Sequence, residues 1–474
     1  MPLNPILRTA RPLTAACTVL LLAGCATFSD DGGFTLVADE ADDKLGTQAR
    51  WLKDDASKVS AIAEVDALLS KELTADSAMQ IALLSNPTLQ GEYANLGIAE
   101  ADLVQAGRLP NPGFSFGKTT GGGAQEIERG LHFNLMAVLT IPARVGIETR
   151  RFEAAKLAAA AATVEVGLEA RAAYFSAIAA RQSLAYFDQV LDSAQASREL
   201  MTRMTRVGNS SRLELAREQL FHAEATAALA MAAKRERGAR ETLIRALGLW
   251  GEQSTVFRLP QRLPDLPTDP EEFTDIEKAA IAQRLDIRQA RHTLDSLASN
   301  LNLTQTTRFI NVLEAGAVQV RDRGEPIRDG YEISLEIPIF DWGGAKIVRA
   351  QALYNQAAER LRATAINARS EVRQAYLGYR TAYDLAKHYR DEVVPLRKRI
   401  SDEQLLRYNG MLIGVFELIS DAREQVASVS AYLDALREFW ISDTSLKTAM
   451  LAGSAPMGGS AGASLPSGGN GGGH

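Results

Sequence analysis

Cysteine and histidine are scarce in this 474-residue sequence, and their scarcity excludes several classes of protein. The two cysteines, Cys17 and Cys25, both lie near the N-terminus, so the rest of the chain can form no internal disulfide and must be stabilised by packing. The five histidines lack the spacing of metal ligands. They are His132, His222, His292, His388 and His474. Because no phosphate-binding loop, nucleophile elbow or paired-carboxylate motif occurs either, we expect neither an enzyme nor a metal site.

One apolar run stands near the N-terminus. Residues 13–23 follow Arg8 and Arg11 and lead into Leu22-Ala23-Gly24-Cys25, which has the pattern of a bacterial lipobox. An ordinary secretory signal and a transmembrane helix are the alternatives, but the run is shorter than the roughly 20 residues that a spanning helix needs. We therefore predict a lipoprotein signal peptide at residues 1–24 and a covalent lipid on Cys25 as the sole cofactor. Ala26 would follow the lipidated cysteine, and an alanine and not an aspartate at that position resembles bacterial lipoproteins that are sorted to the outer membrane.

The charge balance is acidic, which argues against a nucleic-acid partner. The formal net charge is −6, and it becomes −8 when cleavage of the signal peptide removes Arg8 and Arg11. Residues 25–73 are acidic and mixed, so we expect a lipid-anchored arm lying along the outside of the body. No linker rich in proline, glycine and serine divides the middle of the chain, which favours one elongated body. The Gly/Ser-rich stretch at residues 453–474 is expected to be disordered.

The order of motifs occurs twice, about 200 residues apart. Asn86-Pro87, Ile141-Pro142 and Gly208 mark the start of a helix, the end of two alternating stretches and the end of a long helix. The same three points recur in the second copy, at Arg284-Leu285, Ile337-Pro338 and Gly410. Each copy closes on Ala-Arg-Glu-Gln, at residues 216–219 and 422–425. We therefore predict an internally duplicated chain, with repeats at residues 74–275 and 276–452.

Two kinds of segment fill each repeat. Apolar and alanine residues recur every seven positions in the long stretches, as in coiled coils, and residues 144–205 alone would form a helix of roughly 90 Å. Pro395 interrupts the second such stretch, so we expect a bend or break there. The other segments alternate apolar and polar residues, as in Leu131 to Ala137 and Tyr331 to Ile337. These segments predict four strands. Together, the two kinds of segment predict a mainly α fold with a small β part. Because four strands cannot close a membrane barrel, we also expect an oligomer.

The duplicated order of these motifs resembles the outer-membrane efflux protein family, the TolC-like channel-tunnels of tripartite export systems. The resemblance spans residues 74–451 and rests on the two strand-ending Ile-Pro pairs, on the helix start, and on the two turns. The start is Asn86-Pro87-Thr88-Leu89, and the turns are Arg206-Val207-Gly208 and Arg407-Tyr408-Asn409-Gly410. It implies a homotrimer in which each chain gives four strands to a twelve-stranded transmembrane β-barrel, while long coiled-coil hairpins form a periplasmic tunnel.

The resemblance also implies a function. The protein would be a passive exit duct in outer-membrane lipid, anchored by its lipid, extending into the periplasm, and working with a periplasmic adaptor protein and an inner-membrane pump. A lipid-anchored periplasmic coiled-coil scaffold without a pore is the rival hypothesis, although a spacer would not need the four strands. The substrate stays open among metal ions, drugs and polypeptides.

Two sets of site residues follow from the resemblance. The hairpin tips are the hypothesis for the adaptor-docking end; they comprise Val207, Gly208, Asn209, Asn409 and Gly410. Family members carry acidic residues in the lumen near the closed end, which makes Glu417 and Asp421 the candidates for a gate. From turn glycine to the arginine of the following Ala-Arg-Glu-Gln motif, the second copy has thirteen residues where the first has nine. The extra four are about one helical turn, so we expect the second tip to be longer.

Overall fold

The computed structural model describes residues 27–121, 124–310 and 312–453, so Cys25, the predicted signal peptide and all of the predicted tail except Gly453 lie outside the described residues. Its elements form a mainly helical fold with one four-stranded antiparallel sheet, as the sequence predicts. In chain order they are α2 (Thr35–Leu45), α3 (Asp55–Leu69), α4 (Ala75–Ser85), α5 (Pro87–Ala106), β1 (Gly113–Gly121), β2 (Ala124–Asn134), α6 (Leu135–Leu139), α7 (Ile141–Arg206), α8 (Arg212–Leu247), α9 (Gln253–Val256), α10 (Ile276–Gln283), α11 (Leu285–Thr307), β3 (Leu313–Asp322), β4 (Arg328–Leu335), α12 (Gly344–His388), the π-helix η1 (Tyr389–Val393), α13 (Val394–Asn409) and α14 (Val415–Leu451).

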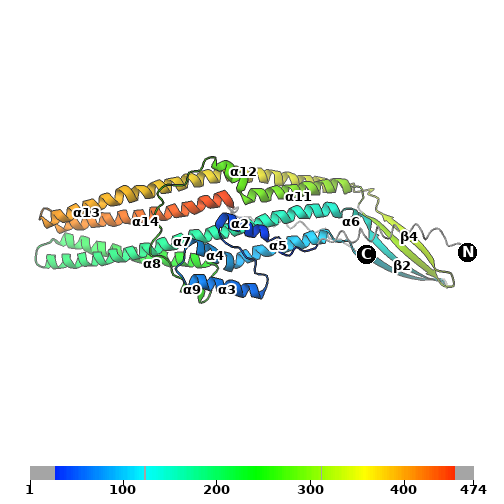
Figure 1. The fold of residues 1–474 in the computed structure, drawn as a ribbon, viewed down its shortest axis with the longest axis horizontal. Helices are drawn as coiled ribbons and strands as arrows, with labels where there is room; N and C mark the ends of the chain where they lie inside the picture. The colour runs from blue at the N-terminus through cyan, green and yellow to red at the C-terminus, as the bar shows by residue number, and fades with distance from the viewer. Residues whose placement is uncertain (1–26, 122–123, 311, 454–474) are drawn as a thin grey trace.

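These elements make a long rod with the sheet at one end (Figure 1). The hairpins α7–α8 and α13–α14 end together at the other end (Figure 1). Helix α7 has 66 residues and therefore reaches roughly 100 Å at 1.5 Å per residue. Toward the sheet, α5, α7, α11 and α12 form one layer, because α7 packs against α5 and α11, and α11 packs against α12. The four strands continue this layer.

The order of elements in residues 74–275 recurs in residues 276–452, and one pair of contacts corresponds between the two. Asn86 caps α5, and its side-chain amide donates a hydrogen bond to the carbonyl of Ala246 in the last turn of α8. Arg284 precedes α11, and its guanidinium donates to the carbonyl of Ala449 near the end of α14, at 3.1 Å. In both repeats, the residue before the inner helix thus ties that helix to the end of the last helix of the repeat.

The main core lies in the middle of the rod and joins both repeats. Phe175 of α7 stacks on Trp440 of α14, with ring centroids 4.9 Å apart, and Phe439 meets Tyr383 of α12 edge to face. The hydroxyl of Tyr174 donates to the carbonyl of Leu73 at 3.0 Å. Offset and edge-to-face pairs stabilise such a core beyond the area that they bury. The long helices are therefore fixed at their midpoints, while both ends of the rod extend from this core.

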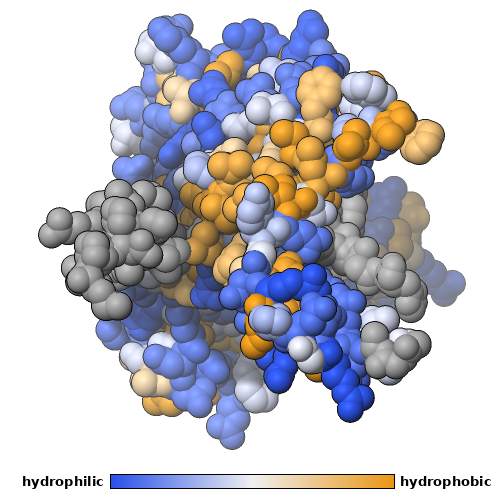
Figure 2. All heavy atoms as spheres, turned by 90° about the vertical axis from the view of Figure 1, so that its right-hand side faces the viewer, coloured by the Kyte–Doolittle hydropathy of each residue, from blue (hydrophilic) through white to orange (hydrophobic). Residues whose placement is uncertain are grey.

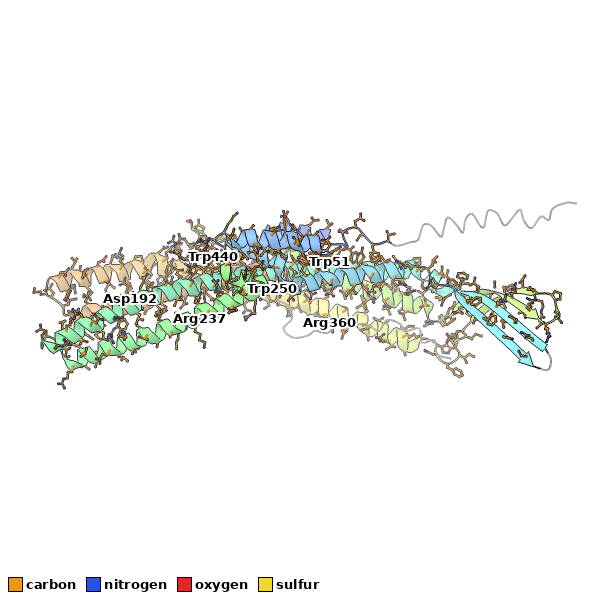
Figure 3. The ribbon with its side chains drawn as sticks, turned by 90° about the horizontal axis from the view of Figure 1, so that it is seen from below. Trp51, Asp192, Arg237, Trp250, Arg360 and Trp440 are labelled. Carbon is orange, nitrogen blue, oxygen red and sulfur yellow. The ribbon has the colours of Figure 1, made fainter. Side chains whose placement is uncertain are left out.

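Residues 27–73 form an arm whose first part lies on α5, α7 and α11, while α3 packs on α4 and α9. Phe34 packs edge to face on Tyr93 of α5, with centroids 4.9 Å apart. The carboxylate of Glu40 in α2 accepts a hydrogen bond from Arg288 of α11. Figure 3 shows the arm on one side of the rod and Arg360 of α12 on the other. One face of the helical layer is therefore covered by the arm and the opposite face is not.

Pro395 disturbs its helix where the sequence predicts a break. The five residues before Val394 are a π-helix, and the N–H of Val394 donates to the carbonyl of Tyr389. Proline has no N–H to donate, and its ring crowds the carbonyl four residues earlier, which belongs to Asp391. A π-bulge accommodates both effects by widening the preceding turn. The helical direction continues into α13 without a loop.

The strands end earlier than the alternation predicts, and this expectation was wrong. β2 stops at Asn134, so Leu135 and Ala137 belong to the short helix α6, and β4 stops at Leu335, before Ile337. The side chain of Asn134 accepts a hydrogen bond from the N–H of Ala137 at 2.8 Å. An asparagine at this position starts a helix by binding its free N–H groups. The cap therefore overrides the alternating pattern.

Candidate functional site

The sheet has one apolar face. Cross-strand partners share a face, and the pairs of Phe114 with Leu131, Leu131 with Ala317, and Ala317 with Tyr331 form one row across all four strands. The apolar side chains occupy the half of this face nearest the helices. They are Phe114, Phe116, Leu131, Phe133, Ala315, Ala317, Tyr331, Ile333 and Leu335. The alternation in the sequence therefore predicted the apolar face correctly, although it did not predict where the strands end.

The other face of the sheet carries mainly small, polar and charged side chains, with Val318 and Val320 of β3 as the apolar exceptions. Ser115 pairs with Gly130, and Glu332 pairs with Gly316. A Cβ added to Gly316 would lie 2.8 Å from the carbonyl oxygen of Leu131, so only glycine fits there without a shift of the strands. Small and charged side chains leave room for water and interact with it well. This face is suited to a water-filled space.

Nothing among the described residues covers the apolar face or the two edges of the sheet. Phe114 is 70% exposed and Tyr331 is 85% exposed. β1 and β4 each pair with one neighbour, so their outer edges carry free N–H and C=O groups. Figure 2, viewed from the sheet end, shows apolar side chains gathered in a band across this end of the rod. The sheet is therefore built for further strands at its edges and for an apolar environment at one face.

The predicted tip residues lie together at the end of the rod opposite the sheet (Figure 1). Val207 and Gly208 follow α7, Gly208 has φ of +80°, and the N–H of Asn209 donates to the carbonyl of Met204. Asn409 is the last residue of α13, and the N–H of Gly410 donates to the carbonyl of Leu406. A cleft of about 550 Å³ separates the two tips, and its lining includes Met201, Met204, Tyr408, Asn409 and Phe416.

The second tip differs from the prediction in two respects. The residue with positive φ is Met411, at +57°, and not Gly410, so Met411 is the structural counterpart of Gly208. Both connections between helices have five residues, so the second tip is not longer. The extra turn lies inside α14, ahead of its Ala-Arg-Glu-Gln motif. Met411 is 93% exposed although its backbone adopts the left-handed conformation that non-glycine residues rarely take.

The two gate candidates occupy different environments. Glu417 is exposed, and its carboxylate accepts a hydrogen bond from the N–H of Gly414 at 2.8 Å, where α14 begins. Asp421 lies one turn later and is buried, with Oδ2 unpaired among the residues that the structure describes. Glu417 thus remains the hypothesis for a charged lumen position, whereas Asp421 can take that role only if its surroundings open.

An ion pair that was not predicted from the sequence joins the two hairpins. Glu218 of α8 is fully buried, and its carboxylate accepts hydrogen bonds from Arg423 of α14 and Ser197 of α7, each at 2.6 Å. Arg423 also lies over the ring of Phe221, with the guanidinium carbon 4.4 Å from the centroid. Glu218 belongs to the first Ala-Arg-Glu-Gln motif and Arg423 to the second. The repeated motif was the signal that could have revealed this contact.

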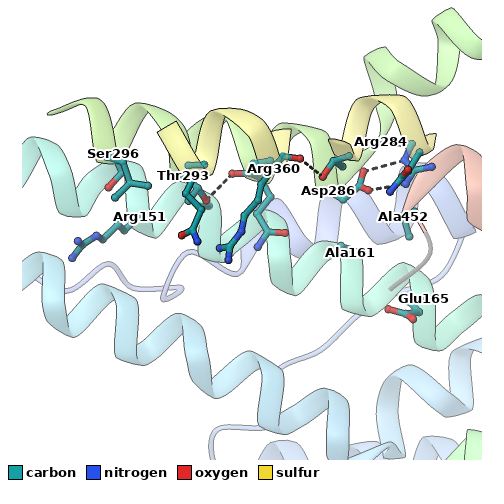
Figure 4. A pocket seen from close by; sticks show the side chains of 18 of the residues that line it. Arg151, Ala161, Glu165, Arg284, Asp286, Thr293, Ser296, Arg360 and Ala452 are labelled. Carbon is teal, nitrogen blue, oxygen red and sulfur yellow. Dashed lines mark hydrogen bonds and ion pairs between the residues drawn. The ribbon is translucent and has the colours of Figure 1, made fainter. Parts of the chain in front are cut away.

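A second network surrounds Arg284 at the edge of a groove of about 920 Å³ between α7, α11 and α12 (Figure 4). Arg284 is buried, and its guanidinium donates to Asp286 at 3.0 and 2.7 Å and to Glu371 at 2.8 Å. Together with the bond to Ala449, these contacts satisfy the charge and fix α10, α11, α12 and α14 to one another. We assign Arg284 a structural role.

Neither a metal centre nor a helical membrane span is found in the described part of the chain. Residues 27–121, 124–310 and 312–453 contain no group of three or more His, Cys, Asp or Glu side chains that could hold a metal ion. In the same ranges, no helix combines the length and the apolar character needed to cross a membrane.

Comparisons with known proteins give one family match and several structures of similar fold. Residues 277–401 match the family model described as outer membrane efflux protein. Curated protein sequences give no significant match. The solved structures of CusC and of the outer-membrane channel OprN are each 18% identical to the chain, with TM-scores of 0.66 and 0.69; the alignments cover 82% and 80% of this chain and 94% and 90% of theirs. The open state of the Neisseria gonorrhoeae MtrE outer membrane channel is also 18% identical, with a TM-score of 0.66, covering 79% of this chain and 88% of that one. At this identity, the likeness establishes the fold.

Proposed function

Because residues 277–401 match the outer membrane efflux protein family and the chain has the fold of outer-membrane channels, we propose that this protein is the outer-membrane channel of a tripartite efflux system. It acts as a passive duct and not as an enzyme. The observation that carries the proposal is the two-faced sheet, with an exposed apolar face, a small polar face and two free edges.

The sheet determines the assembly that we propose. A sheet in lipid must leave no edge unpaired, since a free N–H or C=O group in hydrocarbon costs several kcal/mol. Four strands are too few to enclose a channel, whereas three chains supply twelve and can close β1 of one copy on β4 of the next. The apolar face then meets lipid and the polar face lines water. The protein is a homotrimer in the outer membrane.

The helical part of the rod extends the duct into the periplasm. The two tips end together, and their exposed apolar residues include Val207, Met411 and Leu412. A cleft with apolar rims suits docking of a helical hairpin from a periplasmic adaptor protein, which in turn connects the duct to an inner-membrane pump. The energy for transport comes from the pump. Val207, Gly208, Asn209, Asn409 and Gly410 are the docking residues of this proposal.

Lipid on Cys25 is the second anchor that we propose, on the basis of the lipobox. Cys25→Ser should abolish incorporation of labelled palmitate and leave either uncut precursor or a form without lipid. Because the barrel is an anchor of its own, part of the variant should still fractionate with the outer membrane. Palmitate incorporation that survives this change would refute lipidation at Cys25 and leave the channel proposal intact.

The channel itself is tested by adding the purified protein to a planar lipid bilayer and measuring its mass in detergent. We expect a trimer and stepwise conductance. The rival proposal, a lipid-anchored coiled-coil scaffold, predicts membrane attachment with no conductance. A trimer that binds bilayers but never conducts, in the presence and absence of an adaptor, would favour the scaffold.

A further inference from the structure

A groove of about 720 Å³ lies at the sheet end of the helical layer, between α5, α7, α11 and α12. Its floor is α11, where Asn300, Thr304 and Thr307 follow one another at helical spacing. Its walls are α7 and α12, which flank α11. The cavity between these helices makes the layer concave on this side.

This groove is rich in positive charge, and we call it the cationic groove. Its cationic lining consists of Arg144, Arg151, Arg308, Lys346 and Arg349, against the two carboxylates of Asp102 and Glu148. Each chain thus has a surplus of three positive charges here.

Most of this positive charge has no internal partner. Arg151 pairs with Glu148 at 2.6 Å, and Arg308 lies over the ring of Phe309. Within the part of the chain that the structure describes, Arg144, Lys346 and Arg349 are exposed and form no direct ion pair, although Arg144 attracts the carboxylate of Glu148 at longer range. Burial, together with the nearby charge of Asp102, raises the pKa of Glu148 against the opposing effects of Arg151 and Arg144. Charges left unpaired on a concave surface create a field that acts on solutes.

The cationic groove lies on the side of the layer away from the arm. Arg288 of α11 reaches Glu40 in the arm. Asn300, Thr304 and Thr307 lie about 100–160° round the same helix from Arg288, at 3.6 residues per turn. The arm begins close to Cys25, and a lipid there must reach the membrane, so in a trimer closed around an axis we place the arms on the outside. The cationic groove then faces the interior.

We propose that three cationic grooves form a positive zone of the duct just below the barrel, and that the efflux cargo it favours is the class of small organic anions bearing carboxylate, phosphate or sulfonate groups. This inference rests on the proposed function and adds the charge of its substrate. Rings of cationic side chains in a narrow aqueous path raise the local concentration of anions and lower the barrier to their passage. Three grooves together supply three times the surplus of one chain.

Removal of two unpaired charges from the groove tests this assignment. We compare Lys346→Gln/Arg349→Gln with the matched control Lys234→Gln/Arg237→Gln, which removes the same two residue types from an exposed stretch of α8 remote from the groove (Figure 3). The readouts are the reversal potential in a KCl gradient and block by inorganic triphosphate. The groove variant should lower the chloride-to-potassium permeability ratio by about twofold or more and weaken the block, while the control changes neither. Unchanged values in the groove variant would overturn the inference.

Chemical labelling separates the failure of this inference from that of the proposed function. In Arg349→Cys, a thiosulfonate reagent that attaches a sulfonate should shift the reversal potential further toward cations than a reagent that attaches an ammonium group. Conducting channels that are indifferent to both reagents would mean that the groove lies outside the duct, and would refute the inference alone. Absence of conductance in the unmodified protein would refute the channel itself and the groove with it.

Discussion

Arg423 is the residue whose loss should damage the helical hairpins most. Its guanidinium neutralises Glu218, which has no exposed surface and whose other hydrogen bond comes from Ser197. Removing one partner leaves the other charge buried and unpaired, which typically costs about 3–5 kcal/mol. We expect Arg423→Ala to lower the apparent midpoint of thermal unfolding, followed by circular dichroism in detergent.

A second variant distinguishes lost pairing from lost packing. Arg423 also covers the ring of Phe221, so its truncation removes a contact as well as a charge. The double variant Arg423→Ala/Glu218→Ala leaves no charge unpaired and should recover much of the lost stability, as a double-mutant cycle would measure. If the double variant is as unstable as Arg423→Ala or less stable, the ion pair does not account for the effect.

Residues whose effect is local were predictable from the sequence, and residues whose partner is distant were not. Asn86 before proline specifies a cap within four residues, and Pro395 disturbs its own preceding turn, so both positions were correctly interpreted. Glu218 and Arg423 stand about 200 residues apart, and no local rule relates them. The strain at Met411 was missed because Gly410 offered the usual residue for that conformation one position earlier.

At the scale of elements, β4 offers a direct test of which face meets lipid. Ile333 and Ser334 are neighbours in this strand and point to opposite faces of the sheet. An arginine on the lipid face near the midplane costs about 2–4 kcal/mol, whereas one facing water costs little. Ile333→Arg should therefore lose heat-resistant trimer on a denaturing gel, and Ser334→Arg should keep it.

The comparison of these two variants also addresses the fold. Equal loss of trimer in both would mean that the faces are assigned wrongly. Equal retention in both would mean that the sheet is not in lipid. Leu135 does not suit this test, because it lies in α6 and not in a strand.

The docking of α2 should depend on pH through Glu40. Burial opposes ionisation of this carboxyl, but hydrogen bonds and charge interactions with Arg288 and Lys44 prevail and lower its pKa. A folded-state pKa below the unfolded value stabilises the docked arm at neutral pH, and this stabilisation is lost as the pH falls below the ordinary carboxyl range near about 4.3. Limited proteolysis should therefore release the arm faster in acid, whereas Glu40→Gln should release it at a rate that depends less on pH.

The elements themselves were largely readable, and their ends were not. The seven-residue periodicity predicted a helix at residues 144–205, and α7 runs from Ile141 to Arg206. The alternating pattern continued through Leu135, but a single side-chain bond from Asn134 was enough to start α6. Periodicity reports which face of a segment is buried, whereas a boundary depends on one or two hydrogen bonds of about 1 kcal/mol each.

For the whole molecule, the proposed duct has a cationic zone near the sheet, and the gate hypothesis adds an acidic ring near the tips. The cationic groove lies near the sheet, and Glu417 lies near the tips. Zones of opposite sign in series would each act on the ion current, so the selectivity of the intact channel is a balance that either zone can shift. A change at one zone can therefore be recognised by the direction in which the reversal potential moves.

The gate hypothesis predicts the opposite shift from that of the groove. If Glu417 faces the lumen, three copies form a ring of carboxylates that favours cations and binds a trivalent cation. Glu417 also accepts the N–H of Gly414, so alanine would remove a helix cap, worth about 1 kcal/mol, together with the charge. Glu417→Gln is the better variant, because its amide oxygen can keep that hydrogen bond while the charge disappears. It should move the reversal potential toward anions and relieve block by a trivalent cation added on the periplasmic side, with trimer stability unchanged. If both readings stay at their original values while Lys346→Gln/Arg349→Gln still shifts toward cations, Glu417 is a solvated cap outside the lumen, and the selectivity of the duct resides at its sheet end.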